Sequence, residues 1–157
     1  MNHLFDGKVK YNLNTLQLEY YMLTDPYISK YYGGVLAIDE LPLIVKKPTV
    51  IIVNSDPIRL AGTHWYALLL DNVNEHFDSA GLVPEESLND YLSLQGTKYL
   101  YNSKRVQAFD TDTCGLYCLF YCYFRCRGHS FREIMNMFSD NLKLNEFVVK
   151  LFYSVTT

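Results

Sequence analysis

The chain has 157 residues, of which 49% are hydrophobic and 20% are charged, and it carries a net charge of −3. This length and composition predict one folded domain, residues 1–157, with a sizeable core, and exclude an intrinsically disordered chain. The acidic balance argues against a general nucleic-acid binder held by phosphate contacts, which needs a basic surface.

Neither a secretory signal nor a membrane span is predicted. The N-terminus carries Asn2, His3, Asp6 and Lys8 and lacks an apolar signal region. The longest apolar run, inside 114–124, is too short to cross a bilayer. We therefore expect a soluble intracellular chain, whose thiols stay reduced.

Helical signals come first along the chain. Residues 12–23 have apolar residues at helical spacing, and Asn14 followed by Gln17 is a capping-box pair, so an amphipathic helix is expected there. Asp-Pro at 25–26 predicts the start of a second, short helix. Gly-Gly at 33–34 is the expected stop signal for that helix.

The middle of the chain predicts strands. Residues 49–53 are β-branched, and residues 64–70 are apolar on both faces, as in a strand buried within a sheet. The polar break after them suits a hairpin to a third strand at 75–78. Two further short strands are predicted at 98–101 and 104–109.

Helices are predicted to follow these strands. Pro84 opens a helix that continues to Gln95 and is followed by Gly96. A capping box at Ser130 and Glu133 begins a helix over 131–138, and a last amphipathic helix covers about 143–153. The expected fold class is therefore α+β, with a mostly antiparallel central sheet flanked by helices.

The stretch 107–127 has the strongest pattern. From Cys114 on it is almost wholly apolar and ends in Arg125 and Arg127, which predicts a buried helix with cations at its C-terminal dipole. Residues 110–113 are types that cap a helix start. Cys114 is then a nucleophile candidate, with an exposed sulfur at a helix N-terminus that favours the thiolate. The alternative is that Cys114 is a core thiol like its neighbours.

The cysteines recur every four residues on this helix, as Cys114, Cys118, Cys122 and Cys126. Side chains at this spacing are too far apart for a disulfide, and four ligands on one straight helix cannot surround a zinc ion. We expect no metal site here, and we interpret the last three as small core side chains.

A thiol nucleophile needs a base and an orienting acid. His64 stands at the start of a buried strand, and Asp78 ends the next strand of a hairpin, so the two can lie side by side. Gln107 offers a side-chain N–H group for an oxyanion hole beside the backbone of Cys114. Taken singly, a histidine such as His64 is more often a core or surface residue than a base, and an acid such as Asp78 is more often a strand-end cap.

Taken together, the motifs G-T-H-W, F-D-S-A-G and Q-A-F-D-T-D-T-C-G occur in that order. This set resembles the cysteine endopeptidases of the adenovirus-protease (adenain-like) and SUMO-protease superfamily. The resemblance implies that His64 is the general base, that Asp78 orients it, that Gln107 lines the oxyanion hole and that Cys114 attacks.

The resemblance also implies a substrate. Trp65 and Gly115 are expected to contact a peptide with glycine near the scissile bond. The interval from Gln107 to Cys114 is seven residues, which favours the adenoviral branch, whereas Asp78 followed by Ser79 is more similar to the SUMO branch. We expect an endopeptidase that trims viral or virus-like capsid or core precursors during particle maturation. The alternatives are a protease of ubiquitin-like modifiers and a catalytically dead interaction domain.

Cofactors, partners and location follow from the same resemblance. Adenoviral proteases are stimulated by DNA and by a disulfide-linked peptide. This chain is acidic and all its cysteines lie in one predicted helix, so we expect neither activator. The expected protein is a monomer acting on protein substrates, with nucleic acid at most a weak partner and no membrane. Its expected location is the host nucleus or cytoplasm, or the virion.

Overall fold

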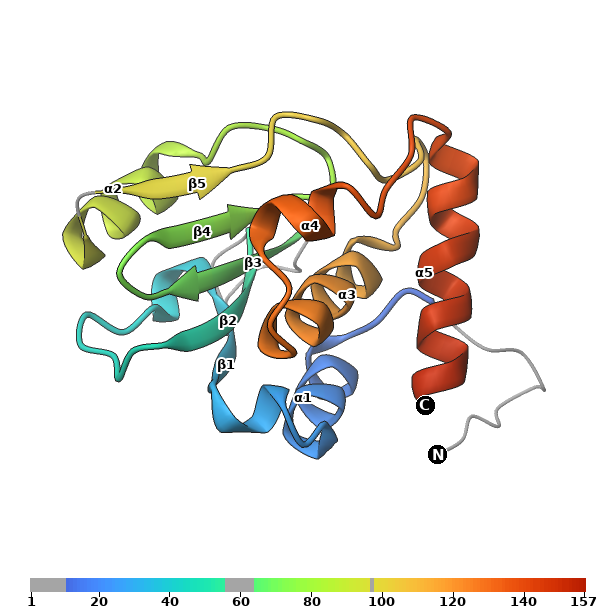
Figure 1. The fold of residues 1–157 in the computed structure, drawn as a ribbon. Helices are drawn as coiled ribbons and strands as arrows, with labels where there is room; N and C mark the ends of the chain where they lie inside the picture. The colour runs from blue at the N-terminus through green and yellow to red at the C-terminus, as the bar shows by residue number, and fades with distance from the viewer. Residues whose placement is uncertain (1–10, 56–63, 97) are drawn as a thin grey trace.

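The computed structural model describes residues 11–55, 64–96 and 98–157. Figure 1 shows its helices and its strands, and η denotes a 3-10 turn. In chain order they are α1 (Thr15–Thr24), η1 (Ile28–Lys30), β1 (Tyr32–Ala37), η2 (Ile38–Glu40), β2 (Thr49–Asn54), β3 (Trp65–Leu70), β4 (Asn74–Phe77), α2 (Glu86–Gln95), β5 (Tyr99–Tyr101), α3 (Cys114–Cys126), α4 (Phe131–Met135) and α5 (Leu142–Thr156).

The five strands form one sheet in the order β1-β2-β3-β4-β5. The α+β class is confirmed, with one correction to the predicted strand directions. The two central pairs are antiparallel, but β1 pairs with β2 and β4 with β5 in parallel. The reason lies in the connections. The short link 71–73 forces a hairpin, whereas η2 with its flanking residues, and α2, are long enough to return the chain for a parallel strand.

The two faces of the sheet bury two different cores, because alternate residues of a strand point to opposite faces. Val50 and Ile52 of β2 belong to the larger core, which includes α1, α3, α4 and α5. Ile51 and Val53 belong to a smaller core closed by α2. The prediction of a buried strand at 49–53 is therefore confirmed. The strand predicted at 64–70 begins at Trp65, and Trp65 and Tyr66 are only partly buried, whereas 67–70 are buried.

Helix α3 occupies the centre of the larger core. It packs against β3, α1, α4 and α5, and its residues from Cys114 to Cys122 are all buried. Figure 1 shows α3 with α1 and α5 close beside it, away from α2. The apolar pattern that predicted a buried helix is thus confirmed, and the helix begins at Cys114, as expected.

Two sequence patterns that depend on contacts within a few residues predicted helix starts correctly. Both capping boxes, Asn14 with Gln17 and Ser130 with Glu133, are present. The helix that Ser130 begins is shorter than predicted, because α4 ends at Met135.

Two predicted elements are wrong. The Asp-Pro sequence at 25–26 starts only the 3-10 turn η1, and the glycines at 33–34 lie in β1 and do not end a helix. Residues 104–109 form no strand. Their backbone bonds instead to the turn after β4, where the carbonyl of Ser79 accepts hydrogen bonds from the N–H groups of Val106 and Gln107.

A buried ion pair ties the far end of α3 to the sheet. Glu75 of β4 is 4% exposed, and Arg125 Nη2 lies 2.9 Å from its Oε2. Arg125 Nε donates to the same carboxylate, and so does the hydroxyl of Tyr121. A buried carboxylate is tolerated only when it is paired and hydrogen-bonded, so these contacts fix the position of α3 on β4.

We expect Arg125→Met to lower the free energy of unfolding by about 3 kcal/mol, since it leaves the Glu75 carboxylate buried without a cation. Urea denaturation measures this change. Lys104→Met is the matched control, because it breaks an exposed pair with Asp140 and should leave stability nearly unchanged. Equal effects of the two substitutions would contradict a structural role for the Glu75–Arg125 pair.

Candidate active site

Cys114 is the first residue of α3, where the backbone N–H groups have no partner within the helix. The structure corrects one part of the sequence prediction, because the residue is 7% exposed and its sulfur is not displayed on the surface. Cys114 instead lines a cavity of about 190 Å³. The other lining residues are Asn12, His64, Trp65, Gln107, Thr111 and Asp112.

The start of β3 and the end of β4 bring a histidine and an acid together. The hairpin register pairs Ala67 with Phe77, so His64 and Asp78 lie at the same end of these two strands. His64 Nε2 is 2.6 Å from Asp78 Oδ1. The Cys114 side chain lines the same cavity as His64 and interacts with it electrostatically. Since Nε2 is bonded to Asp78, Nδ1 is the ring nitrogen left for the thiol.

Asp78 is held in place by its own neighbours. Its side chain is 1% exposed, and its Oδ1 accepts a hydrogen bond from the Ala80 N–H at 2.8 Å. Asn102 fixes the backbone of Asp78 from both sides, because its Oδ1 accepts from the Asp78 N–H and its Nδ2 donates to the Asp78 carbonyl. The carboxylate therefore faces His64 in a rigid setting.

The electrostatics favour a charged imidazole. Burial by itself lowers the pKa of His64, but the hydrogen bond with Asp78 and the electrostatic interaction with Cys114 outweigh it and raise that pKa from 6.5 to about 9. At neutral pH the imidazole therefore holds a proton, and its positive charge lies beside Cys114 in the same cavity.

His76 does not compete for this role. It is 1% exposed, and neither of its ring nitrogens bonds to any residue in the described part of the chain. Burial lowers the pKa of His76 to about 4, so the ring is neutral at physiological pH.

Gln107 lies beside Cys114 in the loop that leads to α3. Its side chain is buried, and its Oε1 accepts a hydrogen bond of 2.6 Å from the Ser79 hydroxyl. Its Nε2 donates to the carbonyl and to the hydroxyl oxygen of Thr111, at 3.1 and 3.0 Å. The N–H₂ end of the amide is therefore on the side of Thr111, which lines the cavity.

The two residues expected to contact substrate have different positions. Trp65 lines the cavity directly. Gly115 is packed behind it, since a Cβ added there would lie 3.6 Å from the Trp65 ring and 3.4 Å from Leu18.

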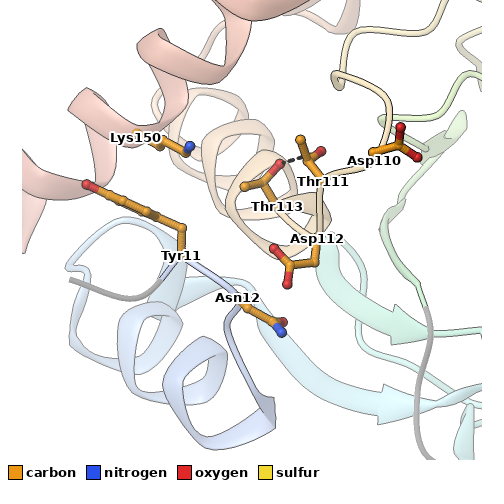
Figure 2. Close-up of a pocket in the computed structure, with 7 residues that line it drawn as sticks. All are labelled: Tyr11, Asn12, Asp110, Thr111, Asp112, Thr113 and Lys150. Carbon is orange, nitrogen blue, oxygen red and sulfur yellow. Dashed lines mark hydrogen bonds between the residues drawn. The ribbon is translucent and has the colours of Figure 1, made fainter. Parts of the chain in front are cut away.

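A second, wider hollow of about 370 Å³ adjoins this cavity and shares Asn12, Thr111 and Asp112 with it. Figure 2 shows that it lies between the loop before α3, the segment before α1 and Lys150 of α5. The ammonium of Lys150 sits over the ring of Tyr11, 5.2 Å from its centroid. The two hollows are therefore neighbours at the N-terminal end of α3.

A buried carboxylate supports the loop before α3. This group was not predicted from the sequence. Glu146 of α5 accepts hydrogen bonds from the hydroxyls of Thr113 and Tyr117 and from the Ala108 N–H. Thr113 therefore does not cap α3 with its side chain, as its residue type had suggested. The available signal was the position of Glu146, three residues before Val149, on the apolar face of an amphipathic helix.

The remaining thiols belong to the core. Burial raises the pKa of Cys118 and Cys122 well above 9.0, and it raises that of Cys126 to about 11. All four cysteines are free. Within the described ranges no group of three or more His, Cys, Asp or Glu side chains could hold a metal ion, and no helix there is long and apolar enough to cross a membrane.

Comparison with known proteins gives only distant likenesses. No protein-family model matches the chain, and no curated protein does either. Among solved structures the chain is similar to the pS273R protease of ASFV, in native form (TM-score 0.49) and selenomethionine form (TM-score 0.47). The identity is 24% in both cases, over 67% of this chain. The chain spans less than half of that protease, 44% and 45% in the two structures.

A third similar structure is the central domain of the uncharacterized Lpg1148 protein from Legionella pneumophila. It is 14% identical with a TM-score of 0.43, and the match covers 80% of this chain and 88% of that domain.

We expect iodoacetamide at neutral pH to alkylate Cys114 at least tenfold faster than Cys118, Cys122 or Cys126. Cys114 alone combines a helix N-terminus, contact with the cavity and a charged imidazole, whereas burial keeps the other thiols protonated. Mass spectrometry of the labelled peptides measures the rates. His64→Ala should reduce the difference, because the imidazole is lost while the helix N-terminus and the cavity remain, and faster labelling of Cys126 would contradict the assignment of the nucleophile.

Proposed function

We propose that the chain is a cysteine endopeptidase in which Cys114 is the nucleophile, His64 the general base and acid, and Asp78 the residue that orients His64. The observation that carries this proposal is the hydrogen bond between Asp78 and His64 beside Cys114, in a cavity that His64, Cys114 and Gln107 line together. No metal and no activating peptide or DNA enters the proposal.

The geometry supports acyl transfer in two stages. The Cys114 sulfur, having given its proton to His64 Nδ1, attacks the carbonyl carbon of the scissile bond and forms a tetrahedral oxyanion. His64 then returns the proton to the leaving nitrogen, the C–N bond breaks, and a thioester remains on Cys114. In the second stage His64 takes a proton from water, whose oxygen displaces the sulfur and releases the acid.

Oxyanion stabilisation is assigned to two donors. One is the backbone N–H of Cys114 at the start of α3, where the helix dipole adds to the hydrogen bond. The other is Nε2 of Gln107, on the side of the amide that faces Thr111. Asp78 keeps Nδ1 of His64 directed at the sulfur and stabilises the imidazolium.

The proposed substrates are proteins with glycine near the scissile bond. Trp65 lines one wall of a cavity of only about 190 Å³, and residues without a large side chain fit such a site best. We assign the activity to the maturation of viral or virus-like capsid or core precursors inside the host cell or the virion, with the enzyme acting as a monomer.

The test of the function is a peptide library incubated with the wild-type chain and analysed by mass spectrometry, with and without a thiol-blocking reagent. Cleavage that disappears on blocking and in Cys114→Ala supports a thiol protease. Cleavage retained by Cys114→Ala would refute the nucleophile, and absence of any cleavage by the intact chain would favour a binding domain.

The pH profile of kcat/KM tests the role of Asp78. We expect an alkaline limb near pH 9, where His64 loses the proton that the leaving nitrogen needs. Asp78→Asn keeps an acceptor oxygen but removes the negative charge that raises this pKa, so the limb should move toward pH 6.5 and kcat should fall. Asp90→Asn, an exposed change on α2, is the control and should leave the limb in place.

The raised pKa of His64 also determines how the stability of the fold changes with pH. Because the pKa of His64 is higher in the folded chain than its ordinary value of 6.5, protonated His64 stabilises the fold fully below about pH 6.5. This contribution is lost as the pH rises through about 9.

Substrate class is tested by matched substrates. We expect a short peptide with an apolar residue a few positions before glycine to be cut nearly as efficiently as a folded precursor, because a maturation protease reads an extended segment. Kinetics on the peptide and on ubiquitin or SUMO fusions measure the ratio. A kcat/KM for the fusion more than about a hundredfold higher, equal to roughly 2.7 kcal/mol, would favour a modifier protease instead.

A further inference from the structure

A glutamine can serve in an oxyanion hole only if its side-chain amide presents the N–H₂ end to the oxyanion. The side-chain amide carries an N–H₂ group at one end and a carbonyl oxygen at the other, and the two ends have nearly the same shape. Only the N–H₂ end stabilises an oxyanion, whereas the oxygen would repel it. Something in the fold must therefore hold the Gln107 amide in one of its two orientations.

The two ends of this amide meet different partners. The Thr111 carbonyl can only accept a hydrogen bond, so it requires the N–H₂ end, which lies 3.1 Å away. At the opposite end, the Ser79 hydroxyl donates to Oε1 at 2.6 Å. The Thr111 hydroxyl accepts from Nε2 and in turn donates to the Ala108 carbonyl, so it is not free to bond Oε1 instead.

Ser79 is itself rigidly placed. It is fully buried, and its carbonyl accepts the N–H groups of Val106 at 2.9 Å and Gln107 at 3.0 Å. These backbone bonds connect the turn after β4 to the loop before α3. They do not involve the hydroxyl, so they remain when the hydroxyl is removed.

From this geometry we infer that Ser79 is a positioning residue, which orients the Gln107 amide so that its N–H₂ group serves the oxyanion. The inference rests on the proposed proteolytic function and adds to it a residue that does not touch the reacting atoms. When an oxyanion forms beside Cys114, it takes one of the two Nε2 hydrogens in place of a Thr111 oxygen. The Ser79 hydroxyl keeps the amide from turning over during this exchange.

The position of Ser79 in the chain also supports a positioning role. Ser79 directly follows Asp78, so one turn at the end of β4 presents the acid that orients the base and the hydroxyl that orients the oxyanion donor. The two catalytic tasks, proton transfer and charge stabilisation, therefore have a common support.

The first experiment is Ser79→Ala, assayed on a cleavable peptide. We expect kcat to fall at least tenfold while KM changes less than about threefold, since the lost interaction acts in the transition state. Ser139→Ala is the matched control. It also removes a serine hydroxyl that contacts a side-chain amide oxygen, that of Asn145, but outside the site, and should leave kcat unchanged.

A double-mutant cycle with Gln107→Ala separates positioning from a general structural effect. If Ser79 acts through Gln107, Ser79→Ala should cause no further loss of kcat in the Gln107→Ala background. The inference is overturned if Ser79→Ala lowers kcat by the same factor in both backgrounds, or if it leaves the wild-type kcat unchanged.

A second pair of variants covers the case in which Ser79→Ala does not fold. Ser79→Thr and Ser79→Val have the same shape and the same packing strain, and they differ only in the hydroxyl. We expect the Thr variant to exceed the Val variant at least tenfold in kcat, and equal values would refute the inference. Cys114→Ala separates a failure of the positioning role of Ser79 from a failure of the proposed function, because cleavage retained in Cys114→Ala would refute the proposed function itself.

Discussion

The burial of α3 is the constraint on which the rest of this structure depends. From Cys114 to Cys122 every residue of the helix is buried, so no side of it is left to solvent over that stretch. The sheet and the helices α1, α4 and α5 therefore have to surround it. A helix held in this way has a fixed N-terminus, and the backbone N–H groups at that end are aimed at one place in the molecule.

Buried carboxylates mark both ends of this helix. Glu75 receives Arg125 and Tyr121 near the C-terminal end, and Glu146 receives Thr113 and Tyr117 at the N-terminal end. Apolar packing alone would let a helix rotate or slide with little change in buried area. Directional hydrogen bonds to charged groups remove that freedom. A site whose side chains must be placed to within a fraction of an ångström requires such a fixed helix.

The sequence was sufficient where the determining contacts are local or follow from strand order. The capping boxes at Asn14 and Ser130, the buried strands and the helix beginning at Cys114 are confirmed. A hairpin of two short strands leaves few ways to place His64 relative to Asp78. Their proximity therefore follows from the order and length of the two strands.

What could not be predicted depends on partners distant in the chain. Asn102 holds the backbone of Asp78 across 24 residues, and Glu146 reaches Thr113 across 33. No local pattern identifies such partners. The parallel edges of the sheet and the burial of Cys114 were missed for the same reason, since both depend on how separate segments pack.

The contact of Glu146 with the loop before α3 also affects when the site is assembled during synthesis of the chain. Synthesis proceeds from the N-terminus, so His64 and Cys114 emerge from the ribosome well before α5. Until α5 is complete, the hydroxyls of Thr113 and Tyr117 lack their carboxylate acceptor, and the loop that carries Gln107 lacks one of its anchors. An unfinished chain therefore has the reactive side chains but not the support that aligns them. Such an order of assembly would delay the proposed activity until the fold is complete.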